Sequence, residues 1–369
     1  MGKSEEFDIA IIGAGPGGYV AAIKAAQSNK SVALIEKDYL GGTCLNCGCI
    51  PTKTLIANAE VLQKIKKADQ YGIHVENLSF DYAKMKERKD SVVTGIRNSL
   101  EGLLKSNKIK IFKGHAKFTG PKDLKIDGED ATNIRAKTII IASGSTTLDI
   151  KAFPADHDKI LNSTSILEMT ELPKTLAIIG GGYIGCEFAS LYAEMGVKVT
   201  ILEAMDTIVA MQGKAIADFL TSSFKKQGIE IKTNVMVTGI DKNADGVTVK
   251  LKDGSSIKCD KALVSIGRRI VSDSLDIEKA GLNLTEKSTI DVDEKLQTGV
   301  PGIYAIGDVT GKAMLAHVAS HQGIVAAVNA TGGEAYMHYN AVPAVIFTHP
   351  EIATVGLTLE DAKKKGLNA

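Results

Sequence analysis

A glycine-rich motif that occurs twice constrains the fold of this 369-residue chain more than any other feature. The pattern G-x-G-x-x-G is formed by Gly13, Gly15 and Gly18 in the first copy and by Gly180, Gly182 and Gly185 in the second. Each copy follows an apolar run, opens a helix-like run, and leads to a second apolar run that ends in an acid. The interval from Gly13 to Glu36 equals that from Gly180 to Glu203. The chain therefore contains a duplicated strand–turn–helix–strand unit.

Each element of this unit suits the binding of a dinucleotide. The first glycine permits a tight turn, the second lets the backbone approach a pyrophosphate, and the third lets the helix pack against the strand. The helix start offers free N–H groups and partial positive charge to the phosphates. The acid, Glu36 or Glu203, hydrogen-bonds a ribose. One such motif would be a weak signal, because glycine turns also serve plain packing. Two copies in the same context predict that the chain binds two dinucleotides.

Further apolar runs extend the predicted sheets. The run TIIIASG leads into Gly144, KALVSIG ends at Gly267, and VPGIYAIGD ends at Asp308. A helix is predicted to follow Asp308, with its start at Met314 to His317. In residues 234–264 apolar and polar side chains alternate between turn residues, which predicts a β-meander at the edge of the second domain.

Three cysteines, Cys44, Cys47 and Cys49, stand within six positions. Cys44 and Cys47 have the C-x-x-C spacing of a metal knuckle or a redox pair. If the segment is helical, Pro51 cannot donate to the carbonyl of Cys47, so the helix must distort there. The distortion permits the wider pair, Cys44 and Cys49, without selecting it. A zinc site is disfavoured, because no other cysteine or histidine pair completes four ligands.

Composition excludes several classes of protein. A net charge of +1 with 24% charged residues gives no general attraction for nucleic acid or acidic membranes. The longest apolar runs are too short to span a bilayer, and the N-terminal MGKSEEFD has no apolar region typical of a signal peptide. Five cysteines suit a reducing cytoplasm, where a close pair is catalytic or metal-binding.

The segment GGTCLNCGCIPTK, beside the first glycine motif, resembles the redox-active site of the flavin-dependent pyridine-nucleotide disulfide oxidoreductases. The similarity runs from about Asp8 to the last residue and includes IIGGGYIGCEFA, SIGRR, YAIGDV, MLAH and YNAVPAVIFTHPEIATVG. Within this family the motifs are most similar to the branch that oxidises dihydrolipoamide. One departure is Cys47, where the family commonly has valine.

The resemblance implies an α/β fold with two Rossmann-like domains, for FAD and for NAD, of three-layer ββα/α type, plus the beginning of an α+β interface domain. The expected division is 1–148 for the first part of the FAD domain, 149–271 for the NAD domain, 272–341 for a return to the FAD and central part, and 342–369 for the start of the dimerisation domain.

The resemblance also implies roles for individual residues. Cys44 and Cys49 form the disulfide, with Cys49 against the flavin and Cys44 exchanging with the dithiol, while Lys53 reaches the flavin edge and pairs with Glu187. FAD would contact Gly13, Gly15, Gly18, Glu36, Lys53, Gly114, Ser143, Gly144, Asp308, Met314, Leu315, Ala316 and His317. NAD would contact Gly180, Gly182, Gly185, Glu187, Glu203, Val237 and Gly267. Purely structural roles remain as alternatives. Cys47 would then pack as a small apolar residue, and His317 would cap a helix or fill space instead of contacting the flavin.

The expected function is oxidation of protein-bound dihydrolipoamide to lipoamide, with reduction of NAD⁺, in the cytoplasm. The resemblance implies a homodimer for the complete family enzyme. Its partners would be the lipoyl domains of 2-oxo acid dehydrogenase complexes or the glycine cleavage carrier protein, with no nucleic acid, membrane or metal. One rival is an NADPH-dependent disulfide or metal reductase, which Glu203 disfavours because a 2′-phosphate prefers arginine. Another is a non-catalytic flavoprotein component of a complex.

The family's interface domain supplies a histidine base with a glutamate five positions later. None of the seven histidines here has that spacing, and the sequence stops soon after the interface domain begins. We therefore expect this chain alone to be a truncated form that lacks the base and turns over dihydrolipoamide poorly.

Overall fold

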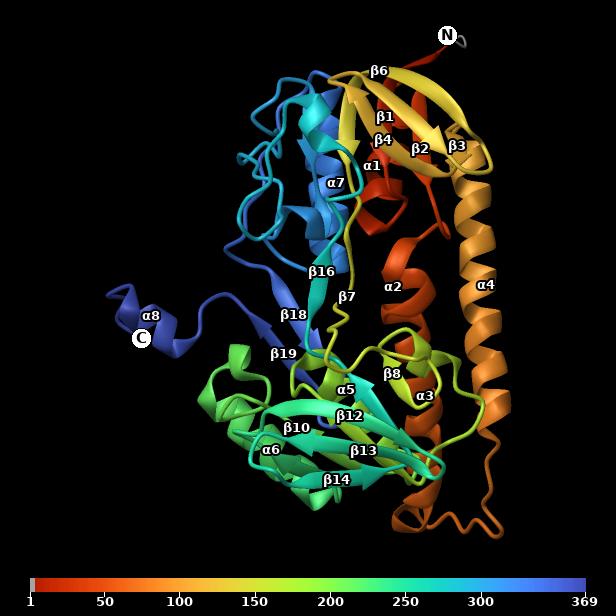
Figure 1. Cartoon of the computed structure of the whole chain (residues 1–369), viewed down its shortest axis with the longest axis vertical. Helices are drawn as coiled ribbons and strands as arrows, with labels where there is room; N and C mark the ends of the chain where they lie inside the picture. The colour runs from red at the N-terminus through yellow and green to blue at the C-terminus, as the bar shows by residue number, and fades with distance from the viewer. Residues whose placement is uncertain (1–3) are drawn as a thin grey trace. The chain divides into compact units, whose positions relative to one another are not determined.

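A parallel sheet forms around each copy of the glycine motif in the computed structural model, which describes residues 4–369 (Figure 1). The chain divides into two compact units of similar size. The first comprises the chain up to Cys49 with Val93–Thr146 and Arg269–Tyr339. The second comprises Ile50–Val92, Thr147–Arg268 and Asn340–Ala369.

The first unit contains a seven-stranded sheet in the order β3-β2-β1-β6-β5-β4, with β17 also paired to β6. Its strands are β1 (Glu5–Ile12), β2 (Val32–Glu36), β3 (Lys110–Lys113), β4 (His115–Gly120), β5 (Asp123–Asp127), β6 (Thr132–Ile141) and β17 (Ile303–Ala305). The strands β3, β2, β1, β6 and β17 are parallel, whereas β4 and β5 join β6 as an antiparallel meander. The long strand β6 therefore belongs to both the parallel part and the antiparallel part of this sheet.

Helix α1 (Pro16–Gln27) packs directly on helix α7 (Ala316–Ala330) in this unit. An added Cβ at Gly323 would lie 2.4 Å from the carbonyl oxygen of Gly17, so the two helix backbones touch. The small residues of α1 noted in the sequence, such as Ala21 and Ala25, are fully buried. Small side chains are therefore needed for this close helix contact rather than for a polar site.

The second unit has a five-stranded parallel sheet in the order β11-β10-β9-β15-β8 and two smaller antiparallel sheets. The parallel strands are β8 (Ile160–Asn162), β9 (Thr175–Ile179), β10 (Lys198–Leu202), β11 (Glu230–Lys232) and β15 (Lys261–Val264). The small sheets are β12 (Val237–Asn243) with β13 (Gly246–Leu251) and β14 (Ser256–Cys259), and β18 (Pro343–Ile346) with β19 (Ile352–Val355). The first of these confirms the predicted meander.

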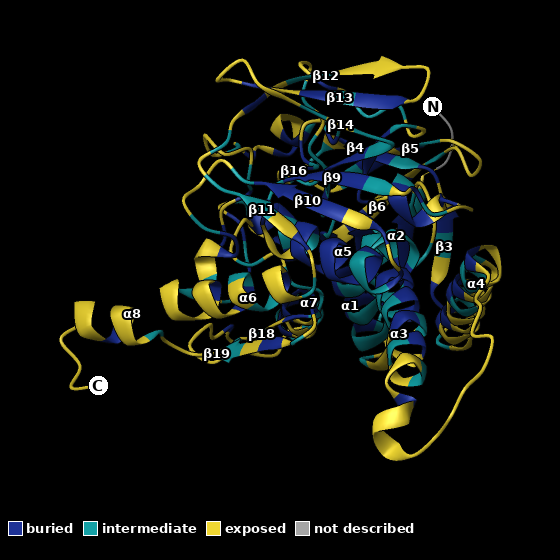
Figure 2. Cartoon of the chain, turned by 90° about the horizontal axis from the view of Figure 1, so that it is seen from below, coloured by how far each residue is buried: buried dark blue, intermediate teal, exposed yellow. Residues whose placement is uncertain are grey.

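The remaining elements are mostly helical. The other helices are α2 (Gly42–Cys47), α3 (Cys49–Lys66), α4 (Tyr82–Ser106), α5 (Tyr183–Glu194), α6 (Lys214–Lys226) and α8 (Leu359–Lys364). The short strands β7 (Ser145–Thr147) and β16 (Arg268–Ile270) pair with each other. Figure 2 shows α5 mostly in dark blue, because its residues from Gly185 to Tyr192 are buried. Within residues 4–369 no helix is long and apolar enough to cross a membrane.

Three predicted element ends shift in the structure. Strand β15 stops at Val264 rather than at Gly267, which has φ +137°. Strand β17 stops at Ala305, before Asp308, which lies in a 3₁₀ turn after Gly307 at φ +73°. A strand cannot continue through that left-handed backbone. Helix α7 begins at Ala316 rather than Met314, because Leu315 is still extended at φ −130° and ψ 130°.

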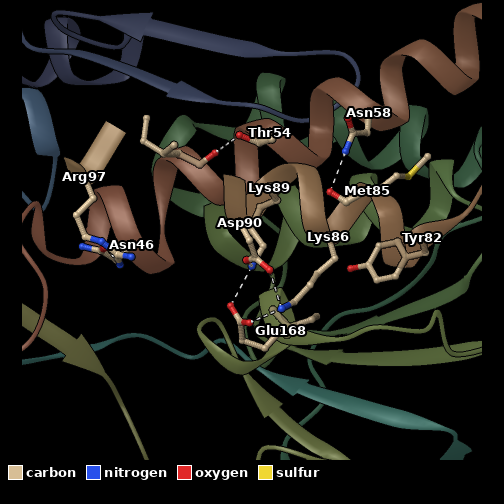
Figure 3. A network of polar contacts seen from close by, with 12 residues as sticks. Asn46, Thr54, Asn58, Tyr82, Met85, Lys86, Lys89, Asp90, Arg97 and Glu168 are labelled. Atoms are coloured by element: carbon tan, nitrogen blue, oxygen red, sulfur yellow. Dashed lines mark hydrogen bonds and ion pairs between the residues drawn. The ribbon is translucent and has the colours of Figure 1, made fainter. Parts of the chain in front are cut away.

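Residues 50–92 pack with the second unit through a buried polar network. The Lys89 ammonium, in a side chain only 2% exposed, lies 2.7 Å from Asp90 and 2.9 Å from Glu168. Lys86 bonds the same two carboxylates, as Figure 3 shows. The Tyr82 hydroxyl lies 3.2 Å from that of the fully buried Tyr192. The boundary after Cys49 falls inside α3, and the boundary after Val92 falls inside α4. The predicted division of the chain into an FAD domain and an NAD domain stays a prediction.

We expect Lys89→Met to change the free energy of unfolding by less than about 1 kcal/mol, because an apolar side chain of similar volume replaces the buried charge. Its former partners are about half exposed and still have Lys86, so water and that lysine can stabilise them. Lys89→Ala also removes the buried stem and should cost about 1–3 kcal/mol. Denaturant unfolding of both variants checks this order.

The control is Lys105→Met on the same helix, where the side chain is 67% exposed and contacts Glu101. It should stay within about 0.5 kcal/mol of the parent chain. An equally large loss for Lys89→Met and Lys89→Ala, well above that of the control, would show that the charge, not the packing of the stem, holds α4 in place.

Candidate functional site

The first glycine of each motif makes the same turn. Gly13 has φ +100° and Gly180 has φ +104°, in the left-handed region that favours glycine. A Cβ on Gly13 would lie 2.4 Å from the carbonyl oxygen of Ala142, and one on Gly180 would lie 2.6 Å from that of Ser265. Both positions therefore require glycine for the turn and for contact with the neighbouring strand.

The third glycine of each motif packs on the first. A Cβ at Gly18 would lie 1.8 Å from the carbonyl oxygen of Gly13, and one at Gly185 would lie 2.0 Å from that of Gly180. No real Cβ atom approaches an oxygen so closely. The third glycine therefore holds the helix against the strand, as the motif predicts.

The second glycine of each motif faces open space instead. A Cβ at Gly182 would meet no atom within 4 Å, and one at Gly15 would meet only the Cα of Gly42 at 4.0 Å. Each residue is also the N-cap of its helix, and neither makes a side-chain cap. The fold does not need glycine there, whereas a pyrophosphate at the uncapped helix start does. This open cradle is what a bound dinucleotide would fill.

The two acids are held at the turns in the same way. The Glu36 carboxylate accepts hydrogen bonds from the N–H groups of Ala14 at 2.8 Å and Asp38 at 2.9 Å. The Glu203 carboxylate accepts them from Gly181 at 2.6 Å and Met205 at 2.7 Å. Burial raises the pKa of Glu36, and the backbone bonds oppose that rise. Both carboxylates lie beside the cradle, where a ribose hydroxyl would be met.

Other predicted FAD contacts lie within the first unit in a connected backbone region. Gly114 donates to the carbonyl oxygen of Glu36 at 2.9 Å. The Ser143 hydroxyl donates to the carbonyl oxygen of Val271, whose own N–H donates to the carbonyl of Gly144. Asp308 accepts a hydrogen bond from the Ser145 hydroxyl. Residues 314 and 317 are exposed immediately around the start of α7.

The two remaining predicted NAD contacts lie within the second unit. Val237 begins β12 and is nearly buried in the core beneath the meander. Gly267, at φ +137°, accepts a hydrogen bond from the N–H of Leu148. Whether these residues touch a nucleotide stays a prediction.

The cysteine segment breaks into two helices at Gly48. Helix α2 ends at Cys47, Gly48 has φ −143° and ψ −109°, and α3 begins at Cys49. Pro51 then stands in the first turn of α3, where its missing N–H removes no helical hydrogen bond. The predicted distortion around Cys47 is confirmed.

Cys44 and Cys49 lie close together near Tyr19 of α1. Burial raises the pKa of the Tyr19 hydroxyl, and negative charge on Cys44 and Cys49 raises it further. Two of the other three cysteines are unsuited to thiolate chemistry, because burial raises the pKa of Cys259 to about 11 and that of the fully buried Cys186 still higher. Thiolate chemistry is thus left to Cys44, Cys47 and Cys49, and the redox role of the wider pair stays a prediction.

Contacts that the sequence did not reveal hold α2 in place. The Asn46 side chain donates to the carbonyl oxygens of Leu40 at 3.0 Å and Gly42 at 2.9 Å. Arg97 of α4 donates to Asn46 at 3.3 Å, and its guanidinium lies 4.5 Å from the ring centre of Tyr39. The partners are up to 58 positions apart, so no local pattern signals them.

The predicted pair of Lys53 and Glu187 is confirmed. The Lys53 ammonium donates to both carboxylate oxygens of Glu187, at 3.0 and 2.9 Å. The Glu187 side chain is 10% exposed and also accepts the N–H of Phe347 at 2.9 Å. Lys53 lies one helical turn after Cys49, and Glu187 lies two residues after Gly185. The pair thus joins the helix that begins at Cys49 to the helix of the second glycine turn.

Comparisons with known proteins agree with this geometry. A family model described as pyridine nucleotide-disulphide oxidoreductase matches residues 7–323, and the dimerisation domain of the same name matches residues 342–369. The chain belongs to the pyridine nucleotide-disulphide oxidoreductase family. It is therefore a flavin-dependent oxidoreductase whose two dinucleotides are FAD and NAD(H). Among the described residues no group of side chains could hold a metal ion.

The relatives span nearly all of the chain. The dihydrolipoyl dehydrogenase of Chlamydia pneumoniae is 50% identical over 366 residues, covering 99% of this chain and 79% of that protein. The dihydrolipoyl dehydrogenase of Geobacillus stearothermophilus is 42% identical, covering 98% and 78%. The solved structure of LpdA from Mycobacterium tuberculosis has a TM-score of 0.92 at 28% identity, covering 98% of this chain and 80% of its own. The solved structure of the flavoprotein disulfide reductase RclA from Escherichia coli has a TM-score of 0.87 at 31% identity, and it covers 98% of this chain and 80% of its own.

The glycine series separates folding from binding in this oxidoreductase. Gly185→Ala should destabilise the protein by about 1–3 kcal/mol, because its Cβ would overlap the carbonyl of Gly180. Gly182→Ala should leave stability within about 0.5 kcal/mol, since φ is −72° and no atom lies within 4 Å. It should nevertheless weaken NADH binding about tenfold or more, because the added methyl group occupies the pyrophosphate cradle.

Melting temperature and NADH titration measure the two effects. Gly95→Ala in α4 is the matched control, because it too has no atom within 4 Å and should leave NADH affinity unchanged. Wild-type NADH affinity in Gly182→Ala would rule out the cradle at the second turn.

Proposed function

We propose that this chain oxidises protein-bound dihydrolipoamide to lipoamide and reduces NAD⁺ to NADH. The observation that carries the proposal is 50% identity to a dihydrolipoyl dehydrogenase over 99% of the chain. The close pair of Cys44 and Cys49 and the two open dinucleotide cradles support it. The balanced reaction converts dithiol and NAD⁺ into disulfide, NADH and one proton.

In the proposed first half-reaction a substrate thiolate attacks the sulfur of Cys44 in a Cys44–Cys49 disulfide. The bond to Cys49 breaks, and Cys49 leaves as a thiolate. The second substrate thiolate then attacks the substrate sulfur bonded to Cys44, closing the lipoamide ring and releasing Cys44. Cys49 is the first residue of the 18-residue helix α3, whose amino end stabilises negative charge on that sulfur.

The chain's own residues would hold the two nucleotides. The first glycine turn would hold FAD together with Glu36, Ser143, Gly144 and Asp308. FAD would supply the two-electron relay between the thiols and nicotinamide. The second turn, with Glu203, would hold NAD⁺ as the exchangeable substrate. The Lys53 ammonium would point towards the flavin edge. The Glu187 carboxylate would balance its charge on the protein side.

The proposal includes a cytoplasmic homodimer and a lipoyl domain as partner. The match of residues 342–369 to the dimerisation domain supports the dimer, and the names of the relatives support the lipoyl substrate. The candidates for that partner are lipoyl domains of 2-oxo acid dehydrogenase complexes and the glycine cleavage carrier protein.

Turnover tests this function against its rivals. The FAD-loaded protein should reduce NAD⁺ with dihydrolipoamide at a low but measurable rate, because none of its seven histidines has the family's spacing to a glutamate. A non-catalytic flavoprotein would give no turnover. An NADPH-dependent reductase would instead prefer NADPH and pass electrons towards a disulfide or metal.

Cysteine variants test the pairing. Cys44→Ser should abolish dithiol oxidation and leave Cys49 able to give a long-wavelength charge-transfer band with oxidised FAD. Cys47→Val is the matched control and should keep flavin reduction by dithiol within about twofold, because small apolar packing is its expected role. Spectra before and after dithiol measure both, and peptide mapping that found a bridge from Cys44 to Cys47 would refute the assignment.

Glu203→Ala should reduce the preference for NADH over NADPH by about tenfold or more, because the carboxylate both accepts ribose hydrogen bonds and repels a 2′-phosphate. The next residues, Ala204, Met205 and Asp206, offer no positive charge to a phosphate. Glu36→Ala makes the equivalent change at the first turn and should weaken FAD binding without altering that preference. Titration with both nucleotides decides, and equal preference in the parent chain would contradict the role of Glu203.

A further inference from the structure

The Lys53 ammonium lies between a carboxylate and an aromatic ring. It donates to both oxygens of Glu187, and it lies 4.2 Å from the ring centre of Phe347. An ammonium has three donors, so two bonds to Glu187 leave one for the negative face of the ring. The ring thus occupies a direction that water would otherwise take.

Phe347 reaches the pair through its backbone as well as its ring. Its N–H donates to Glu187 at 2.9 Å, which fixes the carboxylate that orients Lys53. One residue therefore contacts both members of the ion pair, the carboxylate by hydrogen bond and the ammonium by cation–π contact. The Lys53 side chain is still 33% exposed, so it has freedom that these contacts restrict.

The segment that carries Phe347 is fixed along α5. The N–H of His349 donates to the Ser190 hydroxyl at 2.9 Å, and Gln227 donates to the His349 carbonyl at 2.6 Å. The N–H groups of Phe347 and His349 thus donate to Glu187 and Ser190, which lie three residues apart on one face of α5. Ile346 is also buried in the core of this unit. These contacts fix the backbone on both sides of the Phe347 ring and so define the position of the ring.

We infer that Phe347 is a positioning residue that holds the Lys53 ammonium in its working direction. The inference rests on the proposed function, in which Lys53 serves the flavin edge. Phe347 lies in the part matched by the dimerisation-domain model, whereas Lys53 and Glu187 lie in the part matched by the oxidoreductase model. The dimerisation module therefore contributes to the redox site by directing a charge, without a reacting group of its own at this point.

The test uses FAD-loaded protein with Phe347→Leu, Phe347→Tyr, Lys53→Met and the double variant Lys53→Met with Phe347→Leu. Phe347→Leu should slow flavin reduction about three- to tenfold, matching the usual strength of a cation–π contact. Phe347→Tyr keeps the ring face and should remain within twofold of the parent. Because Phe347 acts through Lys53, the double variant should match Lys53→Met within twofold.

The flavin midpoint potential, measured by chemical reductive titration, gives a second reading independent of turnover. It should move in the same direction in Phe347→Leu as in Lys53→Met. Tyr336→Leu, which removes a ring 5.0 Å from the Lys295 ammonium, is the control and should leave the potential unchanged. If Phe347→Leu does not fold, Phe347→Met supplies an unbranched apolar side chain without a ring.

Equal slowing by Phe347→Leu with and without Lys53 would overturn the inference, because a residue that only fills space acts independently of the ammonium. So would an unchanged potential in Phe347→Leu. The absence of any flavin reduction by dihydrolipoamide in the parent protein would instead refute the proposed function, while the potentials would still test the role of Phe347.

Discussion

Contact between backbones at the two glycine turns is the constraint on which the rest of the structure depends. The Cα of Gly18 lies over the carbonyl of Gly13, and that of Gly185 over the carbonyl of Gly180, with no room for a methyl group. This contact fixes each helix on its strand and points the helix start at the space beyond the second glycine. The acids, cysteines and ion pair are then placed by their distance along the chain from these turns.

The duplicated turns place different chemistry beside similar cradles. In the first unit the turn lies against the start of α2, since a Cβ on Gly42 would be 2.7 Å from the Cα of Gly15. The cysteine segment is thereby held next to the first cradle. In the second unit the helix after the turn carries Glu187, which binds Lys53. The same glycine turn thus lies beside the cysteine segment in one copy and carries the partner of Lys53 in the other.

The sequence predicted the features that local chemistry dictates. Glycine spacing predicted both turns, and Pro51 predicted the helix break near Cys47. The pair of Lys53 and Glu187, 134 positions apart, was implied only by the family resemblance. The sequence did not predict that residues 50–92 pack with the second unit, because that depends on Lys89 and Tyr82 meeting Glu168 and Tyr192 from distant positions. Nor did it predict Phe347, whose aromatic ring in an apolar run looks like ordinary core. Contacts of this kind depend on tertiary packing, which no local spacing encodes.

The open surroundings of the second glycines have a consequence for how the sequence can vary. A Cβ at Gly15 would come no nearer than 4.0 Å to the Cα of Gly42, and one at Gly182 would meet no atom within 4 Å. A side chain at either position would therefore disturb the bound dinucleotide more than the fold. Selection for the cofactor acts on these two positions, whereas selection for the folded chain acts on the first and third glycines of each motif.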